Sequence, residues 1–279
     1  MQHRQGNLTR ATGRCYVLRT VSLIGEVHRG TAVISHTAKC IIVALSLLCA
    51  TAHAETLAVP ENLVDLRSEQ GEQLLLESDA REAYVPLSIN FLTQKNQAFC
   101  GVASIVMVLN ALEVPAPTTP EYEPYRTFTQ DNFLDERTEA VLPREVLMKQ
   151  GMTLDEIGRL LALHPVEAEV HHAADSSLEG FRSAALEHLG REDRAVIVNY
   201  LRKAIGQERG GHISPLAAYD AETDQFLILD VARYKYPPVW VGADELFAAM
   251  NTTDADNQNK TRGYVLVRKA GSTPAASAN

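Results

Sequence analysis

Cysteine is scarce in this chain of 279 residues, and three of its four cysteines lie within the first 49 residues. Cys100 is therefore the only thiol in the part of the sequence that has ordinary globular composition. A domain with one cysteine can form no internal disulfide and no multi-cysteine metal cage. In an oxidising compartment such a lone cysteine is a candidate reactive thiol.

The chain also lacks any cluster of basic residues after residue 54. The full sequence carries 26 Lys and Arg against 35 Asp and Glu, a net charge of −9. The first 39 residues are basic, so without residues 1–54 there remain 20 basic and 34 acidic residues, a net charge of about −14. Such a surface repels nucleic acid, and we therefore exclude nucleic-acid binding.

The N-terminal segment has the three parts of a secretory signal peptide. A basic region precedes an apolar run at residues 41–50, which is too short to span a bilayer, and an Ala-x-Ala sequence follows. We expect cleavage after Ala54, export and a periplasmic location, with translation starting near Val33. The mature chain is then expected to hold one domain free of the membrane, residues 55–269, and a disordered tail, residues 270–279.

Hydrophobic periodicity divides the expected domain into a helical half and a sheet half. Apolar residues recur at helical spacing after Cys100, whereas β-type segments separated by short turns follow residue 190. The sequence therefore predicts an α+β fold with an antiparallel sheet, and Thr153 and Ser177 are expected to cap helices. An arm with one or two helices (63–76) is predicted at 55–90. Further helices are predicted at 100–112, 143–150, 153–164, 177–189 and 243–250, strands at 195–201, 212–219, 225–230 and 262–268, and a surface loop at 121–140.

Cys100 lies where a polar loop meets an apolar helix. The loop Gln94-Lys-Asn-Gln-Ala-Phe leads into Cys100, and the helix follows at once. Unpaired backbone N–H groups and the positive end of the helix dipole meet at such a junction, and both favour a thiolate over a thiol. The position is typical of a nucleophile rather than of a structural cysteine.

A cysteine nucleophile needs a base, a group that orients the base, and a donor for the oxyanion. His212 follows two glycines that allow close approach to its ring, and Asp230 ends an apolar strand one hairpin later. If these strands pair around a turn at 220–224, His212 and Asp230 become neighbours. Gln94, six residues before Cys100, can project an amide N–H toward an oxyanion. Each residue type also has an ordinary structural role, so the prediction depends on their occurrence together.

At these residues, and over most of residues 85–268, the chain resembles the phytochelatin synthase family. The family has a papain-like catalytic domain, so the resemblance implies a papain-like α+β fold. It also implies Cys100 as the nucleophile, with His212 as general base and acid and Asp230 as its orienter. Gln94 becomes the oxyanion donor. The matching text is Gln94-x5-Cys100-Gly-x-Ala-Ser104, Phe128-Thr-Gln-Asp-Asn-Phe133, Gly211-His212-x-Ser-Pro215, Leu229-Asp230-Val-Ala-Arg233-Tyr-Lys-Tyr-Pro-Pro-Val-Trp240, Asn251-Thr-x-Asp254 and Arg262-Gly-Tyr264.

The reaction implied by the resemblance is acyl transfer from glutathione through a cysteine thioester, linked to metal detoxification. Heavy-metal ions would take part as metal–glutathione thiolate substrates, and no tightly bound cofactor or protein metal site is implied. Members of the family tend to form homodimers. Four residues in matching segments are implied to bind the γ-glutamyl carboxylate and amine of the substrate: Arg233, Asp254, Arg262 and Tyr264.

The acceptor of the acyl group is a separate question. Plant members of the family carry a second, cysteine-rich domain that is associated with metal and efficient transpeptidation. Here no cysteine follows Cys100. We therefore expect hydrolysis to γ-glutamylcysteine to be favoured, with phytochelatin synthesis as the second outcome.

Two other functions stay open at the level of the sequence. One is a general papain-like peptidase, and the other is a non-catalytic protein that binds thiols or metal through Cys100. His171 and His172, with His164 nearby, lack the spacing of a closed metal site, so we expect solvated histidines on a loop and no metal site there.

Overall fold

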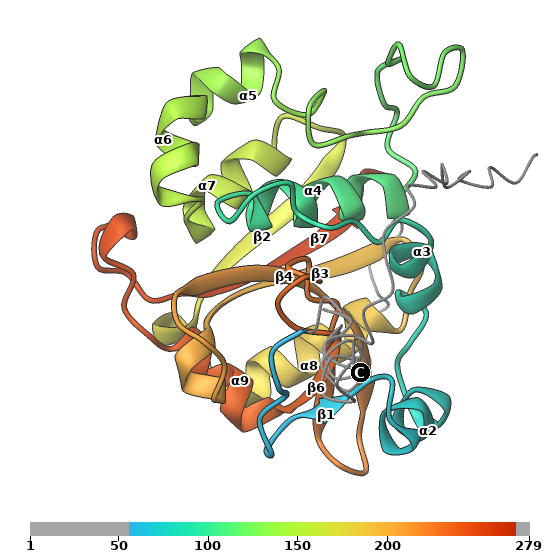
Figure 1. Ribbon diagram of the computed structural model, residues 1–279, viewed down its shortest axis with the longest axis vertical. Coiled ribbons are helices and arrows are strands. Elements are labelled where there is room, and N and C mark those ends of the chain that lie inside the picture. Colours follow the sequence, from blue (N-terminus) through green and yellow to red (C-terminus); the bar gives the residue numbers. More distant parts are fainter. Residues whose placement is uncertain (1–55, 272–279) are drawn as a thin grey trace, which may run out of the picture. The chain divides into compact units, whose positions relative to one another are not determined.

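A seven-stranded antiparallel sheet forms the centre of the computed structural model, which describes residues 56–271 (Figure 1). Across the sheet the order is β1 (Val64–Asp65), β6 (Val239–Gly242), β5 (Gln225–Ile228), β4 (Gly211–Asp220), β3 (Arg194–Leu201), β7 (Gly263–Lys269) and β2 (Val166–His172). The hairpin β4–β5 lies in the middle of this order, and its turn falls at the predicted position. Strands that are distant in sequence, β3 and β7, also pair side by side.

Helices cover both faces of the sheet. The described helices are α2 (Glu69–Glu77), α3 (Tyr84–Ile89), α4 (Cys100–Ala111), α5 (Glu136–Val141), α6 (Arg144–Gln150), α7 (Leu154–Leu161), α8 (Leu178–Leu189) and α9 (Ala243–Met250). Helices α4 and α7 pack on one face, and α8 and α9 pack on the other (Figure 1). The α+β class predicted from the sequence is confirmed.

The predicted helix starts are confirmed at two caps. The Thr153 side chain accepts the backbone N–H of Glu156, whose carboxylate accepts the N–H of Thr153, so α7 begins with a complete capping box. The Ser177 side chain accepts the N–H of Gly180 at the start of α8. Both residues satisfy N–H groups that have no partner within the helix.

Parts of the sequence prediction were wrong. The histidine segment expected on a loop is the edge strand β2, in which Val166-Glu-Ala-Glu-Val170 alternates apolar and acidic residues as a half-solvated strand does. The loop expected at 121–140 contains the start of α5, because Asp135 caps the N–H groups of Arg137 and Thr138. The arm expected at 55–90 does contain two helices, α2 and α3, but α2 begins six residues later than expected and α3 lies beyond residue 76. Strands β1 and β6 were not predicted.

Two predicted segments fall outside the described part of the chain. The expected signal peptide, residues 1–54, precedes it, and all of the expected tail except residues 270–271 follows it. Among the helices within residues 56–271, none is both long enough and apolar enough to cross a bilayer.

Helix α4 is the most deeply buried helix, and a hydroxyl joins it to the sheet. Its residues from Cys100 to Leu109 are all buried. The hydroxyl of Ser104 lies 2.8 Å from the carbonyl oxygen of Cys100 and 3.1 Å from that of Ile213 on β4. This contact fixes the beginning of α4 against the strand that carries His212.

Candidate active site

The thiol of Cys100 lies at the first residue of α4. Cys100 is 7% exposed and free, and Phe99 at the N-cap position offers no side-chain cap to the helix. The first backbone N–H groups of the helix are therefore available to a ligand beside the sulfur. The location predicted from the sequence is confirmed.

The loop before Cys100 is held by a buried amide that the sequence analysis did not single out. Gln130 accepts the N–H of Lys95 at 2.9 Å and donates to the carbonyl oxygen of Thr93 at 2.9 Å. Gln130 is only 6% exposed. Gln130 belongs to the segment 128–133. Through this residue the segment holds Thr93 and Lys95, and so positions the loop that leads to the thiol.

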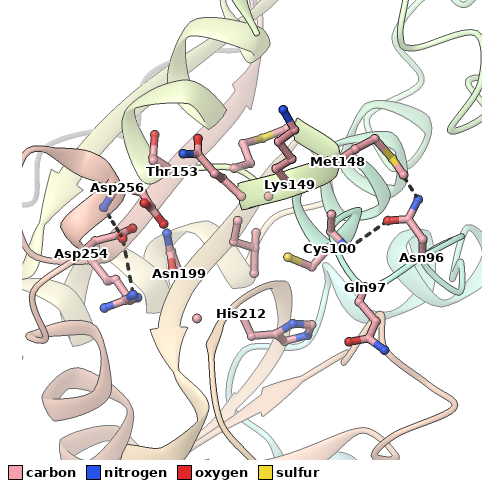
Figure 2. Close-up of a pocket in the computed structure, with 17 residues that line it drawn as sticks. Asn96, Gln97, Cys100, Met148, Lys149, Thr153, Asn199, His212, Asp254 and Asp256 are labelled. Carbon is pink, nitrogen blue, oxygen red and sulfur yellow. Dashed lines mark hydrogen bonds and ion pairs between the residues drawn. The ribbon is translucent and has the colours of Figure 1, made fainter. Parts of the chain in front are cut away.

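His212 connects the thiol to a buried carboxylate. Its Nε2 lies 2.8 Å from Oδ1 of Asp230 and 3.1 Å from the hydroxyl of Ser214. Cys100 and His212 both line one cavity and lie beside each other in it (Figure 2). Because Nε2 faces Asp230, Nδ1 is the nitrogen left for the sulfur. The predicted proximity of His212 and Asp230 is confirmed, and it results from the β4–β5 hairpin.

Asp230 also binds a buried arginine that sequence reasoning missed. Nη2 of Arg202 lies 2.9 Å from Oδ1 and 2.8 Å from Oδ2 of Asp230, and the N–H of Ala232 donates to Oδ1 at 2.8 Å. Asp230 is fully buried and Arg202 is 3% exposed. Burial opposes ionisation, but the charges and hydrogen bonds of His212 and Arg202 outweigh it and lower the pKa of Asp230 to about 2.

The electrostatics of the site favour a thiolate next to an imidazolium. Burial raises the pKa of the Cys100 thiol, but the hydrogen bond and charge of His212, with backbone groups of Ile213 and Gly101, outweigh it, so the pKa is lowered. Burial lowers the pKa of His212, but the charge of Asp230 and the two hydrogen bonds outweigh it, so that pKa is raised. Opposite shifts of this kind separate a nucleophile from its proton donor.

Gln94 and His212 line the same cavity, but the amide of Gln94 has hydrogen-bond partners elsewhere. Its Nε2 donates to the carbonyl oxygen of Asn96 at 2.7 Å and to the hydroxyl of Tyr234 at 3.1 Å. Gln94 does not line the cavity that contains the sulfur. It lines a second cavity, and His212 lines both. Its role as an oxyanion donor stays a prediction.

The sulfur opens into a cavity of about 410 Å³. Gln97 and Asn96 lie at the end near the sulfur, and Asp254, Asp256 and Asn199 lie at the opposite end (Figure 2). Arg262 also lines the cavity, with Nη2 3.5 Å from Oδ1 of Asp254 and Nη1 donating to the carbonyl oxygen of Thr253 at 2.7 Å. One end of the cavity therefore offers both carboxylates and a guanidinium.

Two of the four predicted substrate-binding residues, Asp254 and Arg262, line this cavity and two do not. Arg233 is exposed, and its guanidinium lies 4.5 Å from the centroid of the Phe91 ring. Tyr264 is buried, with its ring 4.9 Å from that of Phe181 and its hydroxyl 3.0 Å from the hydroxyl of Ser176. Of the four predicted substrate-binding residues, the structure therefore brings together only Asp254 and Arg262.

The histidines outside the cavity have structural partners. His172 binds the carbonyl oxygen of Thr261 at 2.6 Å and Asp155 at 2.7 Å, and the ring of His171 stacks on Tyr264. These half-buried contacts correct the expectation of solvated histidines. Within residues 56–271, no three His, Cys, Asp or Glu side chains are grouped as metal ligands.

A thiol at a helix start, an imidazole on the adjacent strand and a buried carboxylate form the arrangement found in cysteine-dependent acyl-transfer enzymes. Comparison with known proteins narrows this class. A family model described as phytochelatin synthase matches residues 54–264. Since this match covers most of the sequence, the chain belongs to the phytochelatin synthase family.

The similar curated proteins are all named as glutathione γ-glutamylcysteinyltransferases. Glutathione γ-glutamylcysteinyltransferases 1 and 3 from Lotus japonicus are 37% identical over 209 residues and 35% identical over 214 residues. These matches cover 74% and 76% of this chain, but 40% and 43% of the relatives. The transferase from Schizosaccharomyces pombe is 28% identical over 212 residues, which cover 75% of this chain and 50% of that protein. The chain thus spans half or less of the length of these relatives.

Proposed function

We propose that the protein transfers the γ-glutamylcysteinyl group of glutathione through a thioester on Cys100. The observation that carries the proposal is the placement of Cys100 beside His212 in one cavity (Figure 2), with His212 in turn 2.8 Å from Asp230 and charged groups at the far end of the cavity. The names of the similar transferases support the choice of glutathione as donor. The papain-like form of the α+β fold is part of the same proposal.

In the first step, the Cys100 thiolate attacks the carbonyl carbon between the cysteine and glycine of glutathione. The backbone N–H of Cys100 stabilises the oxyanion, and Gln94 is the proposed second donor once its amide leaves Asn96 or Tyr234. The imidazolium of His212 protonates the glycine nitrogen as the C–N bond breaks. Asp230 keeps the imidazole ring in the orientation that this proton transfer needs.

The thioester is then resolved by an acceptor. Water gives γ-glutamylcysteine, and the amine of a second glutathione gives a longer peptide with two γ-glutamylcysteine units. In either case neutral His212 takes a proton from the acceptor and the thiolate is released. Hydrolysis and phytochelatin synthesis are therefore two outcomes of one intermediate.

The far end of the cavity is suited to the zwitterionic end of the donor. The γ-glutamyl group carries an α-ammonium and an α-carboxylate on the same carbon. Asp254 can pair with the ammonium and Arg262 with the carboxylate, because both line the cavity and lie 3.5 Å from each other. An ordinary peptide has an amide nitrogen in this position and would offer no ammonium group to the carboxylate of Asp254.

Four further properties belong to the proposal. The basic and apolar segment before Ala54 supports export to the periplasm, which N-terminal sequencing of the protein from a cell fraction would test. Heavy-metal ions act through glutathione thiolates, the mature chain stays free of the membrane, and two copies form a homodimer, which light scattering would test.

The direct test is the release of free glycine from glutathione. We expect release by the unaltered protein and none by the Cys100→Ala variant, with Ser88→Ala on the surface helix α3 as a control that keeps activity. Cleavage of ordinary peptides with glutathione left intact would favour a general peptidase. Stoichiometric uptake of thiol or metal without turnover would favour a binding protein. Either of these results would contradict the proposal.

A further inference from the structure

Two methionines lie in the wall of the cavity that contains the Cys100 sulfur. Every residue from Met148, in the last turn of α6, to Thr153, which caps α7, lines this cavity. Met148 is 50% exposed, and its Sδ lies 3.7 Å from Nδ2 of Asn96 in the loop before Cys100. Figure 2 shows Met148 and Asn96 together at the end of the cavity that holds the Cys100 sulfur.

The second thioether, that of Met152, packs on the first turn of α4. Met152 is 7% exposed, and its Sδ lies 2.8 Å from the point that a Cβ on Gly101 would occupy. The lack of a side chain at Gly101 therefore lets this sulfur lie against the residue that follows Cys100. The cavity wall thus has one buried and one half-exposed thioether at its Cys100 end.

The proposed reaction places the sulfur of the donor glutathione at the same end. The attacked carbonyl belongs to the cysteine of glutathione, so the carbon that bears its side chain is bonded directly to the carbonyl carbon. The γ-glutamyl group leaves that carbon through the amide nitrogen and extends toward Asp254 at the far end of the cavity (Figure 2). The donor's sulfur, and any ion bound to it, therefore lies among the side chains near Cys100.

A cation beside Met148 suits an anionic form of the donor. Lys149 is exposed and lines the cavity, and no carboxylate within residues 56–271 forms an ion pair with it. A divalent metal ion held by two glutathione thiolates carries net negative charge, because the carboxylates and thiolates outnumber the positive groups. Lys149 attracts such a complex, and the neighbouring thioethers are ligands that soft metal ions accept.

We propose that Met148 and Met152 make this cavity selective for glutathione whose sulfur carries a soft metal ion, with the two thioether sulfurs contacting that ion. The inference rests on the function proposed above and adds which form of the donor is preferred. The ion stays on the donor's sulfur during acyl transfer, and each thioether offers it a lone pair. Because Zn²⁺ is a harder ion than Cd²⁺, it gains less from thioether ligands, and the Cd²⁺ complex is the better substrate.

The experiment uses Met→Leu variants of the full chain, because leucine keeps the volume and apolar character of methionine but has no sulfur. The test variants are Met148→Leu, at a half-exposed position where the substitution leaves the fold intact, and the double variant Met148→Leu/Met152→Leu. The matched control is Met250→Leu, which removes a fully buried thioether from the end of α9 that lines neither cavity described above.

Glycine release is measured with metal-free glutathione, with its Cd²⁺ complex and with its Zn²⁺ complex. We expect the unaltered protein to have a lower KM for the Cd²⁺ complex than for the Zn²⁺ complex. The double variant should raise KM for the Cd²⁺ complex roughly tenfold, the low end of the loss in metal affinity when a residue that supports a metal site is removed. Its KM for metal-free glutathione should stay within about twofold of the unaltered protein, because that donor makes no metal contact. Met148→Leu should show part of the same effect, and Met250→Leu should show none.

Equilibrium dialysis measures the contact without turnover. Cys100→Ala cannot be acylated and offers no protein thiol to the metal ion. We expect the Cd²⁺–glutathione complex to bind to Cys100→Ala more tightly than to Cys100→Ala/Met148→Leu/Met152→Leu, by roughly the same tenfold factor.

The outcomes separate this inference from the proposed function. If the unaltered protein releases no glycine from any form of glutathione, the proposed function is wrong, and dialysis still reports whether the thioethers contact the metal ion. If the double variant and Met250→Leu have the same KM for the Cd²⁺ complex, or if the two Cys100→Ala chains bind it equally, the inference is overturned. An equal loss on metal-free glutathione would also overturn it, because it would show a general effect on the cavity.

Discussion

Replacing Arg202 with methionine tests whether its buried guanidinium stabilises the fold and affects the pKa of His212. The substitution keeps most of the side-chain volume but removes the guanidinium from Asp230. Asp230 is fully buried, so solvent cannot replace the lost charge. The variant also removes the hydrogen bond from Arg202 to Gln207 and the contact of its guanidinium with the Tyr236 ring.

The size of the effect follows from the burial of the pair. Removing one partner of a buried ion pair lowers the free energy of unfolding by about 3–5 kcal/mol. Asp230 keeps His212 and the N–H of Ala232 as partners, so we expect the lower end, about 3 kcal/mol. The matched control is Arg67→Met, which breaks an Arg–Asp pair whose arginine is 64% exposed and should cost less than about 1 kcal/mol.

Urea unfolding measures the stability, and a pH profile separates catalysis from folding. The charge of Arg202 lowers the pKa of His212, so its loss raises that pKa. The alkaline limb of kcat/KM, where the imidazolium loses its proton, should therefore move to higher pH in Arg202→Met. The reasoning is refuted if this variant is as stable as Arg67→Met, or if its alkaline limb keeps the position of the unaltered protein.

Two further substitutions test the charge of Asp230 and the contact of Ser104 with β4. In Asp230→Asn the charge that raises the pKa of His212 is lost, so the alkaline limb of kcat/KM should move to lower pH and kcat should fall roughly 100-fold; an unchanged limb would contradict the assigned ion pair. The Asp230 carboxyl, whose pKa is lowered from 3.8 to about 2, contributes about 2 kcal/mol that is present above pH 3.8 and is lost as the pH falls through 2. Acid unfolding of Asp230→Asn should therefore lack this loss. Ser104→Ala should lower the free energy of unfolding by about 1–2 kcal/mol, against a smaller effect of Ser88→Ala at the surface; equal effects would show that the contact between α4 and β4 contributes little.

The parts of the site that the sequence predicts depend on local patterns. The apolar period after Cys100 defines the helix start, and a turn-rich segment between two β-type runs defines the hairpin. Once the hairpin is assumed, antiparallel pairing runs from the turn outward to Leu216 and Ile228, and beyond this pair His212 meets Asp230. No long-range information is needed for this step.

The parts that the sequence does not predict depend on packing between distant elements. Arg202 follows β3, and its pairing with Asp230 results from the position of β3 beside β4, which no local pattern contains. Gln130 reaches the loop before Cys100 across 35 residues of chain, and its polar neighbours give no sign that it is buried. Strand β2 did have a local signal, since its alternation of apolar and acidic residues is typical of an edge strand.

The resemblance of short segments to a family carries less information about individual side chains than about the fold. Arg233 and Tyr264 lie in segments that match the family as well as Asp254 and Arg262 do. Only the second pair lines the cavity. Arg262 lies just before β7 and contacts Asp254, whereas Tyr264 lies within β7 and packs against Phe181. The exposed Arg233 lies over the Phe91 ring. The identity of a segment therefore does not determine which of its residues contact a substrate.

The central claim is that Cys100 becomes acylated by glutathione, and intact mass spectrometry tests it most directly. The full chain is mixed with glutathione, quenched in acid within the first turnovers, and weighed. We predict an adduct with the mass of one γ-glutamylcysteinyl group, located on the peptide that contains Cys100 and removed by hydroxylamine, as expected for a thioester. An enzyme that releases glycine without ever carrying this adduct, or that carries it equally in Cys100→Ala, would contradict the account.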